Sequence, residues 1–103
     1  MKRRFRANVL LCLNLRGWSV EDLGLAVWGP YGAGIDTPRR RMHRILQRAS
    51  RGRKYITLED IETIAAVLEI PPPMLAYGSA DEVRAALLNT LPELNGDQME
   101  VRL

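Results

Sequence analysis

Apolar residues recur every three or four positions in five segments of this chain, the spacing of amphipathic helices. The segments span residues 4–15, 20–28, 38–49, 58–70 and 81–91. A short turn through residues 74–75 follows three consecutive prolines, and residues 95–103 form a tail with a weak strand signal. The pattern therefore predicts an all-α domain of five or six helices.

Residues with capping propensity stand before three of these segments. Ser19 precedes the second segment, with Asp22 three residues later as in a capping box, and Thr57 repeats this pattern before the fourth. Thr37 precedes Pro38, a pair that favours the start of a helix. Residues 29–36 are rich in glycine, lack helical spacing and predict a loop.

The segment at 38–49 combines an apolar face with a basic face. Winding it as a helix puts four apolar residues together: Met42, Ile45, Leu46 and Ala49. Three arginines and a glutamine fall opposite: Arg40, Arg44, Gln47 and Arg51. Eight of the eighteen residues at 37–54 are Arg or Lys, and none is acidic. The pattern predicts a folded helix whose arginines face a polyanion.

Charge is divided unevenly along the chain. Residues 1–54 hold 13 basic and 3 acidic side chains, whereas residues 55–103 hold 2 basic and 9 acidic ones, for a net charge of +3. One face is therefore suited to nucleic acid. Cys12 is the only cysteine and His43 the only histidine, so neither a disulfide nor a cysteine-based metal site is expected. We expect no enzymatic activity, metal or cofactor, and a buried Cys12.

The first sixteen residues resemble a secretion signal, because a basic start precedes an apolar stretch. Asn8 and Asn14 interrupt that stretch, Arg16 ends it, and no small-residue cleavage site follows. No segment approaches the ~20 apolar residues that cross a bilayer. We expect a cytoplasmic protein with no membrane partner.

Three segments, in their order and spacing, resemble phage repressor, Cro and XRE-type regulators. Residues 15–24 contain a basic and glycine turn, a capping serine and a Leu-Gly pair. Residues 51–61 resemble the family's R-G-x-x-x-x-(S/T)-L link, and residues 64–71 resemble its L-A-x-x-L-x-(V/I)-(P/S) close. The resemblance covers about residues 4–77. It implies a lambda-repressor-like helix-turn-helix fold that acts as a sequence-specific, DNA-binding transcriptional regulator.

The chain departs from that family in two places. About eight residues, 29–36, join the second and third helices, where the family uses three or four. Their glycines either bring backbone N–H groups to a phosphate or simply make a wide turn. Val20 occupies the position where the family often has a phosphate-binding Gln. Gly24 fits the small residue that lets the third helix pack closely on the second.

The resemblance implies roles for individual residues, with the third helix in the major groove. Base contacts are expected from Arg39, Arg40, His43 and Arg44. Phosphate contacts are expected from Ser19, Thr37, Arg41, Arg48, Arg51, Arg53 and Lys54. An N-terminal arm on the backbone or in the minor groove, or else a frayed tail, is expected from Lys2, Arg3, Arg4 and Arg6.

The resemblance also divides the chain into a DNA-binding domain at residues 1–78 and a C-terminal helix and tail at 79–103. Regulators of this family usually bind as two-fold dimers, so a homodimer is expected to use the C-terminal part. The candidate dimerisation residues are Val83, Leu87, Leu91 and Val101.

Other interpretations of the sequence stay open. The basic helix could be a packing helix with solvated arginines, or the domain could be an adaptor that binds an acidic protein. An antitoxin-like regulator would bind a basic protein through its acidic C-terminal half. RNA binding is less favoured, because the chain has few aromatic residues. A steep salt dependence would separate nucleic-acid binding from an adaptor.

Overall fold

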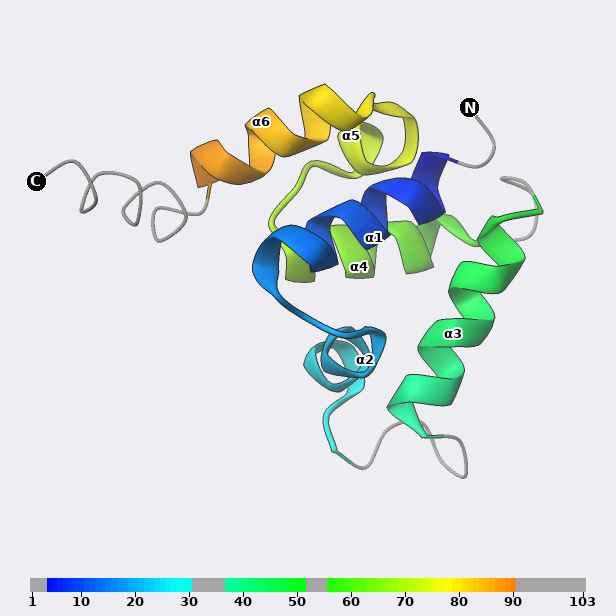
Figure 1. Ribbon diagram of the computed structural model, residues 1–103. Coiled ribbons are helices and arrows are strands. Elements are labelled where there is room, and N and C mark those ends of the chain that lie inside the picture. Colours follow the sequence, from blue (N-terminus) through cyan, green and yellow to red (C-terminus); the bar gives the residue numbers. More distant parts are fainter. Residues whose placement is uncertain (1–3, 31–36, 52–55, 91–103) are drawn as a thin grey trace, which may run out of the picture.

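The computed structural model describes residues 4–30, 37–51 and 56–90, and every regular element in these ranges is a helix (Figure 1). The helices, in chain order, are α1 (Arg4–Arg16), α2 (Val20–Trp28), α3 (Pro38–Ala49), α4 (Leu58–Leu68), α5 (Pro72–Tyr77) and α6 (Ala80–Thr90). The prediction of an all-α chain is confirmed for these residues. The loop at 31–36 and the weak strand signal near the C-terminus lie outside them.

Side-chain caps start α2, α3 and α4 where the sequence predicts them. The Ser19 hydroxyl accepts from the Asp22 N–H at 3.1 Å, and the Asp22 carboxylate accepts from the Ser19 N–H at 2.8 Å. The Thr37 hydroxyl accepts from the Arg40 N–H, and the Thr57 hydroxyl accepts from the Asp60 N–H. These bonds satisfy backbone donors that a helix leaves open at its N-terminus.

Two of the three consecutive prolines belong to a helix, α5. Helix α4 ends at Leu68, because Glu69 adopts a left-handed conformation with φ of 60°. Pro72 and Pro73 then occupy the first positions of α5, where a missing N–H costs no helical hydrogen bond. The expected turn at residues 74–75 is thus part of a six-residue helix.

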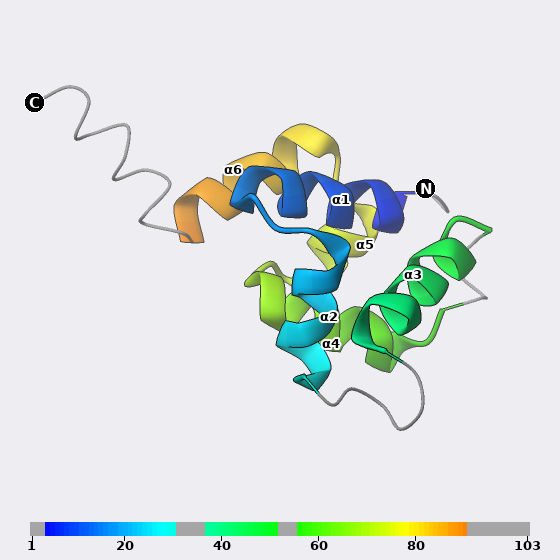
Figure 2. The same ribbon diagram turned by 60° about the horizontal axis from the view of Figure 1, so that its bottom comes forward.

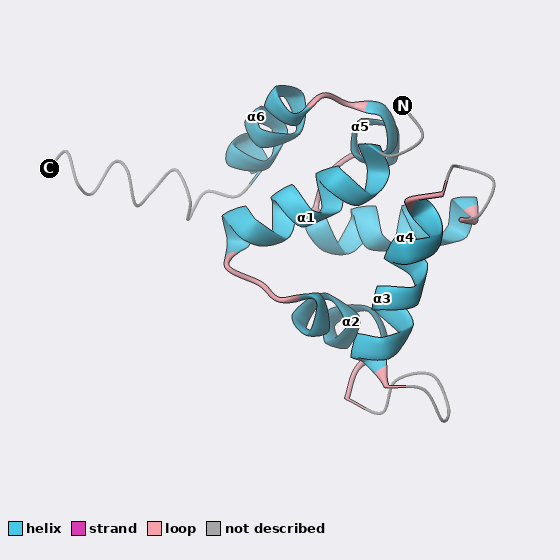
Figure 3. Cartoon of the chain, turned by 45° about the vertical axis from the view of Figure 1, so that its right-hand side comes forward, coloured by secondary structure: helices cyan, strands magenta, loops and turns pink. Residues whose placement is uncertain are grey.

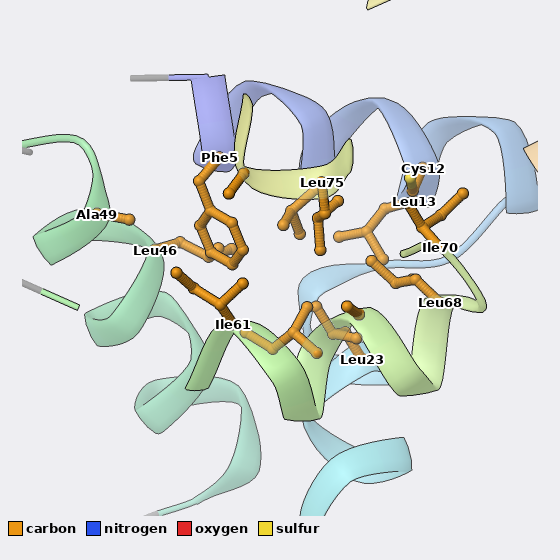
Figure 4. Close-up of a cluster of buried hydrophobic side chains, with 14 of the residues drawn as sticks. Phe5, Cys12, Leu13, Leu23, Leu46, Ala49, Ile61, Leu68, Ile70 and Leu75 are labelled. Atoms are coloured by element: carbon orange, nitrogen blue, oxygen red, sulfur yellow. The ribbon is translucent and has the colours of Figure 1, made fainter. Parts of the chain in front are cut away.

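All six helices contribute to one hydrophobic core. Figure 4 shows side chains of α1, α2, α3, α4 and α5 pointing toward a common centre, among them Phe5, Leu23, Leu46, Ile61 and Leu75. The expectation that Cys12 is a buried apolar residue is confirmed, since its exposed fraction is 0%. Burial raises the pKa of the Cys12 thiol to about 11, against a smaller lowering by Arg16.

Helix α1 joins the two ends of the molecule. It packs against α5 and α6 on one side and contacts α3 on the other, while α2 packs against α3 and α4. Figures 1 and 2 both place α3 at one edge of the molecule and α6 at the opposite edge. Figure 3 shows α2 and α3 lying side by side, away from α5 and α6. The two helices with the predicted contacts therefore form one end of the fold.

Asn8 fixes α1 to the junction between α5 and α6. The side chain is 3% exposed, and its amide nitrogen donates to the carbonyls of Leu75 and Gly78, both at 2.9 Å. These two bonds satisfy carbonyls beside the end of α5. In the sequence Asn8 is only an interruption of an apolar stretch, whereas in the fold it is a buried structural residue.

Arg16 fixes the other end of α1 to the end of α4. Its guanidinium donates to the carbonyl of Leu68 at 2.9 Å and lies 3.4 Å from the carboxylate of Glu69. It also lies over the Trp18 ring, 4.8 Å from its centroid. A cation at a helix C-terminus is favourable, because the terminal carbonyls carry partial negative charge. This arginine therefore acts within the fold.

The expected dimerisation surface on α6 is corrected by the structure. Val83 and Leu87 are both 0% exposed and belong to the same core as α1 and α5. Their apolar face is covered by the chain itself, so it cannot also face a second copy in this conformation. Leu91 and Val101 lie outside the described residues.

Candidate nucleic-acid interface

The second and third helices are in unusually close contact at Gly24. A Cβ atom at this position would lie 2.5 Å from the carbonyl oxygen of Pro38 and 2.7 Å from its carbonyl carbon. Because both atoms belong to the backbone of α3, no side-chain rotation could make room. The expectation that Gly24 allows close packing is confirmed, and this contact sets the position of the first turn of α3.

Helix α3 has one buried face and one exposed face. The predicted apolar residues Met42, Ile45, Leu46 and Ala49 are all buried. The exposed face carries four arginines, a histidine and a glutamine: Arg39, Arg40, His43, Arg44, Gln47 and Arg48. The four residues that were expected to contact bases are therefore together on one solvent-facing surface.

A groove of about 390 Å³ runs between the first turns of α2 and α3. Thr37, Arg39, Arg40 and His43 line it from the side of α3, and Glu21 lines it from α2. The groove thus combines guanidinium and imidazole groups with one carboxylate. The sequence did not assign a role to Glu21, because nothing in the chain order places it next to these arginines.

A second groove, of about 420 Å³, continues along α3 toward its C-terminal end. His43 and Gln47 from α3, Val20 from α2 and Arg6 from α1 are among its lining residues. His43 lines both grooves, so it lies between them. Gln47, which has no assigned role in the sequence analysis, faces the same strip of surface as the expected base contacts.

Two of the four residues of the expected N-terminal arm belong to a helix. Arg4 and Arg6 both belong to α1. Arg4 donates to the Tyr77 carbonyl at 3.1 Å, so it is a structural contact between α1 and α5. Arg6 is exposed beside α3 and can follow a polyanion along that helix. Lys2 and Arg3 lie outside the described residues.

Arg41 is one of the expected phosphate contacts, but in the structure its side chain packs on α2. Its guanidinium lies over the Trp28 ring, 4.6 Å from the centroid, and the residue is only half-exposed. A cation held over an aromatic face gains about 0.5–1 kcal/mol at such a site. We therefore assign Arg41 to the packing of α3 on α2.

The other expected phosphate contacts have different surroundings. Arg48 and Arg51 are exposed at the C-terminal end of α3, whereas Arg53 and Lys54 lie outside the described residues. Thr37 is exposed, and its hydroxyl oxygen caps α3. The oxygen and N–H of Ser19 are both used in the capping box of α2.

The carboxylates of Glu21 and Asp22 occupy the first turn of α2. A phosphate at this helix end would meet two negative charges, so the expected contact at Ser19 is unfavourable.

Two further features bear on the class of site. Within the described residues, no group of three or more His, Cys, Asp or Glu side chains could hold a metal ion. No helix in the same part of the chain is long and apolar enough to span a bilayer.

Comparison with known proteins leaves the family open. No protein-family model matches the chain, and no match was found among curated proteins or solved structures. The resemblance to repressor-type regulators therefore rests on the sequence segments.

Proposed function

We propose that this chain is a helix-turn-helix protein that binds double-stranded DNA in a sequence-specific manner and regulates transcription. The observation that carries the proposal is the exposed face of α3, where four arginines, His43 and Gln47 stand opposite a fully buried apolar face. A rigid helix with this face fits the major groove, which is wide enough to admit one α-helix.

The contact between α2 and α3 supports the same proposal. A helix that enters the groove needs a second helix to hold it at a fixed angle, and Gly24 brings the two backbones together at Pro38. The stack of Arg41 on Trp28 adds a second contact between this pair of helices. Both contacts lie behind the exposed face and leave it open to a ligand.

Different parts of α3 have different roles in the proposed complex. Arg39, Arg40 and His43 lie in its first two turns and face base edges, where an arginine can bind the O6 and N7 atoms of guanine together. Arg48 and Arg51 lie near the C-terminal end and contact phosphates. Arg6 of α1 adds a phosphate contact beside the groove that it lines with His43 and Gln47.

The decisive experiment selects binding sites from a random duplex pool with the full chain at near-physiological salt. We expect an enriched motif that contains G·C pairs. Arg40→Ala should weaken binding to that motif about 10- to 100-fold and relax the preference at one position, because one bidentate guanine contact is worth about 1–3 kcal/mol.

Arg84→Ala, which removes an exposed arginine of α6, is the matched control and should bind as the wild type does. Binding that falls with salt but enriches no motif would contradict sequence specificity, because phosphate contacts alone give that behaviour. If the wild type retains no duplex at all, the DNA proposal fails and a protein partner on the basic or acidic surface becomes the better explanation.

A further inference from the structure

The groove between α2 and α3 contains one negative charge among its positive ones. Glu21 is exposed in the first turn of α2 and lines this groove with Arg39, Arg40 and His43. In the described residues no ion pair joins Glu21 to either arginine, since the ion pair found there is between Arg16 and Glu69. The Glu21 carboxylate therefore faces the same space as the residues proposed to contact bases.

The Glu21 side chain makes no bond in the cap of α2. Its neighbour Asp22 closes the capping box with Ser19, so the cap of α2 is complete without the Glu21 side chain. Leu23 and Gly24 carry the packing of this turn, and both are buried. The negative charge of the Glu21 carboxylate is favourable at this position, because it lies at the N-terminal end of a helix.

A carboxylate in this place restricts what can bind next to it. It repels phosphate oxygens, and it repels the O6 and N7 of guanine and the O4 of thymine, because all of these are acceptors. It can accept a hydrogen bond from the exocyclic amino group of cytosine or adenine in the major groove. Among these, cytosine is favoured, because it pairs with the guanine that Arg39 or Arg40 binds.

We propose that Glu21 is a specificity-determining residue, which accepts a hydrogen bond from the N4 amino group of the cytosine that pairs with the guanine contacted by α3. This inference rests on the proposed DNA-binding function and adds a base contact from α2 to those from α3. The groove then recognises a G·C pair from both sides, with arginine on the guanine and Glu21 on the cytosine.

The test repeats the site selection with wild type, Glu21→Gln and Glu21→Ala, together with Glu62→Gln as a control. Glu62 is exposed on α4 in the groove beside Tyr77, which no residue of α3 lines, so its substitution removes the same charge outside the candidate site. We expect both Glu21 variants to lose roughly ten-fold of the cytosine preference at one position, while the other positions keep their preference. Glu62→Gln should leave every position unchanged.

Two results would overturn the inference, and they are distinguishable. If the Glu21 variants select the wild-type motif and merely bind all duplexes more tightly, Glu21 only weakens non-specific attraction and contacts no base. If the wild type selects no motif, the proposed function itself fails, and the inference fails with it. Thermal unfolding of each variant verifies that α2 is still folded when the motifs are compared.

Discussion

Arg16 and Arg40 lie on helices that pack against the same core, yet their surroundings are opposite. The Arg16 guanidinium is largely buried, where it caps α4 and lies over Trp18. Arg40 is exposed on α3 beside a groove. Arg4 and Arg41 resemble Arg16, because each contacts another helix, while Arg39 and Arg48 resemble Arg40 in exposure.

The difference separates two sides of the molecule. On the side of α1, polar groups join helices: Asn8 bonds α1 to the end of α5, and Arg16 bonds α1 to the end of α4. On the side of α2 and α3, helix contact depends on Gly24, on apolar residues and on the stack of Arg41 over Trp28, while the exposed face of α3 is directed to solvent. A count of arginines cannot distinguish these uses, because it ignores which donors are already bonded within the chain.

The largest expected effect is a loss of stability from a substitution in α1. Asn8→Asp replaces a buried amide donor with a carboxylate that faces two carbonyl oxygens, so the free energy of unfolding should fall by about 3–5 kcal/mol. Urea unfolding measures the change. Asn14→Asp makes the same substitution at an exposed position of α1 and should change stability little. Equal losses in the two variants would contradict the structural role of Asn8.

Two glycine substitutions, one on each side of the molecule, test whether the two sides contribute differently to DNA binding. Gly24→Ala and Gly78→Ala each place a Cβ atom 2.5 Å from a backbone oxygen, that of Pro38 or that of Met74. Each should lower the free energy of unfolding by about 1–3 kcal/mol.

Only Gly24→Ala should also weaken DNA binding by the folded protein, because it displaces the first turn of α3. Unfolding and duplex binding are measured on the same samples, below the unfolding transition. Loss of binding in Gly78→Ala as well would mean that the two sides are not independent.

The smallest effect is a pH dependence at the start of α6. The Ser79 N–H donates to the Glu82 carboxylate at 2.9 Å, and this bond, together with the Ser79 hydroxyl, lowers the pKa of Glu82 from its ordinary 4.5. A lowered pKa in the folded state gives stability that is present above pH 4.5 and is lost as the pH falls through the folded value.

Glu82→Gln should therefore be less stable than the wild type at neutral pH, with a gap that closes in acid. Urea unfolding from pH 7 to pH 3 measures that gap. Adding Ser79→Ala to Glu82→Gln should cost less than it does in the wild type, because the two residues share one cap. A gap that is constant with pH would contradict this account.

The sequence predicts the helices well where local chemistry decides their ends. Ser19, Thr37 and Thr57 cap the three helices they were expected to cap, since capping depends on residues within one turn. The apolar face of α3 follows from its periodicity alone. The cap at Ser79 was missed, and α6 begins at Ala80, one residue before the expected start.

The long-range partners of a helix face could not be predicted from local sequence in the same way. The periodicity of α6 identifies Val83 and Leu87 as apolar, but only the fold shows that the chain's own core covers them. Asn8 likewise needs partners 67 and 70 residues away, which no local pattern contains. In the candidate site, periodicity places the exposed residues of α3 together, Gln47 included, but it does not bring Glu21 beside them, because that depends on how α2 and α3 meet.

The long-range bonds of α1 have a consequence for synthesis on the ribosome. The basic helix α3 is complete once Ala49 has been added. The hydrogen bonds of Arg16 to Leu68 and of Asn8 to Gly78 can form only after residues 68 and 78 have been synthesised. Contacts this distant in sequence form only after the intervening chain exists, and closing them carries an entropic cost. A nascent or truncated chain that stops before residue 68 thus carries most of the positive charge without the bonds that hold α1 to α4 and α5. Such fragments should bind polyanions indiscriminately, and under the proposed function any selectivity among duplexes requires the complete fold.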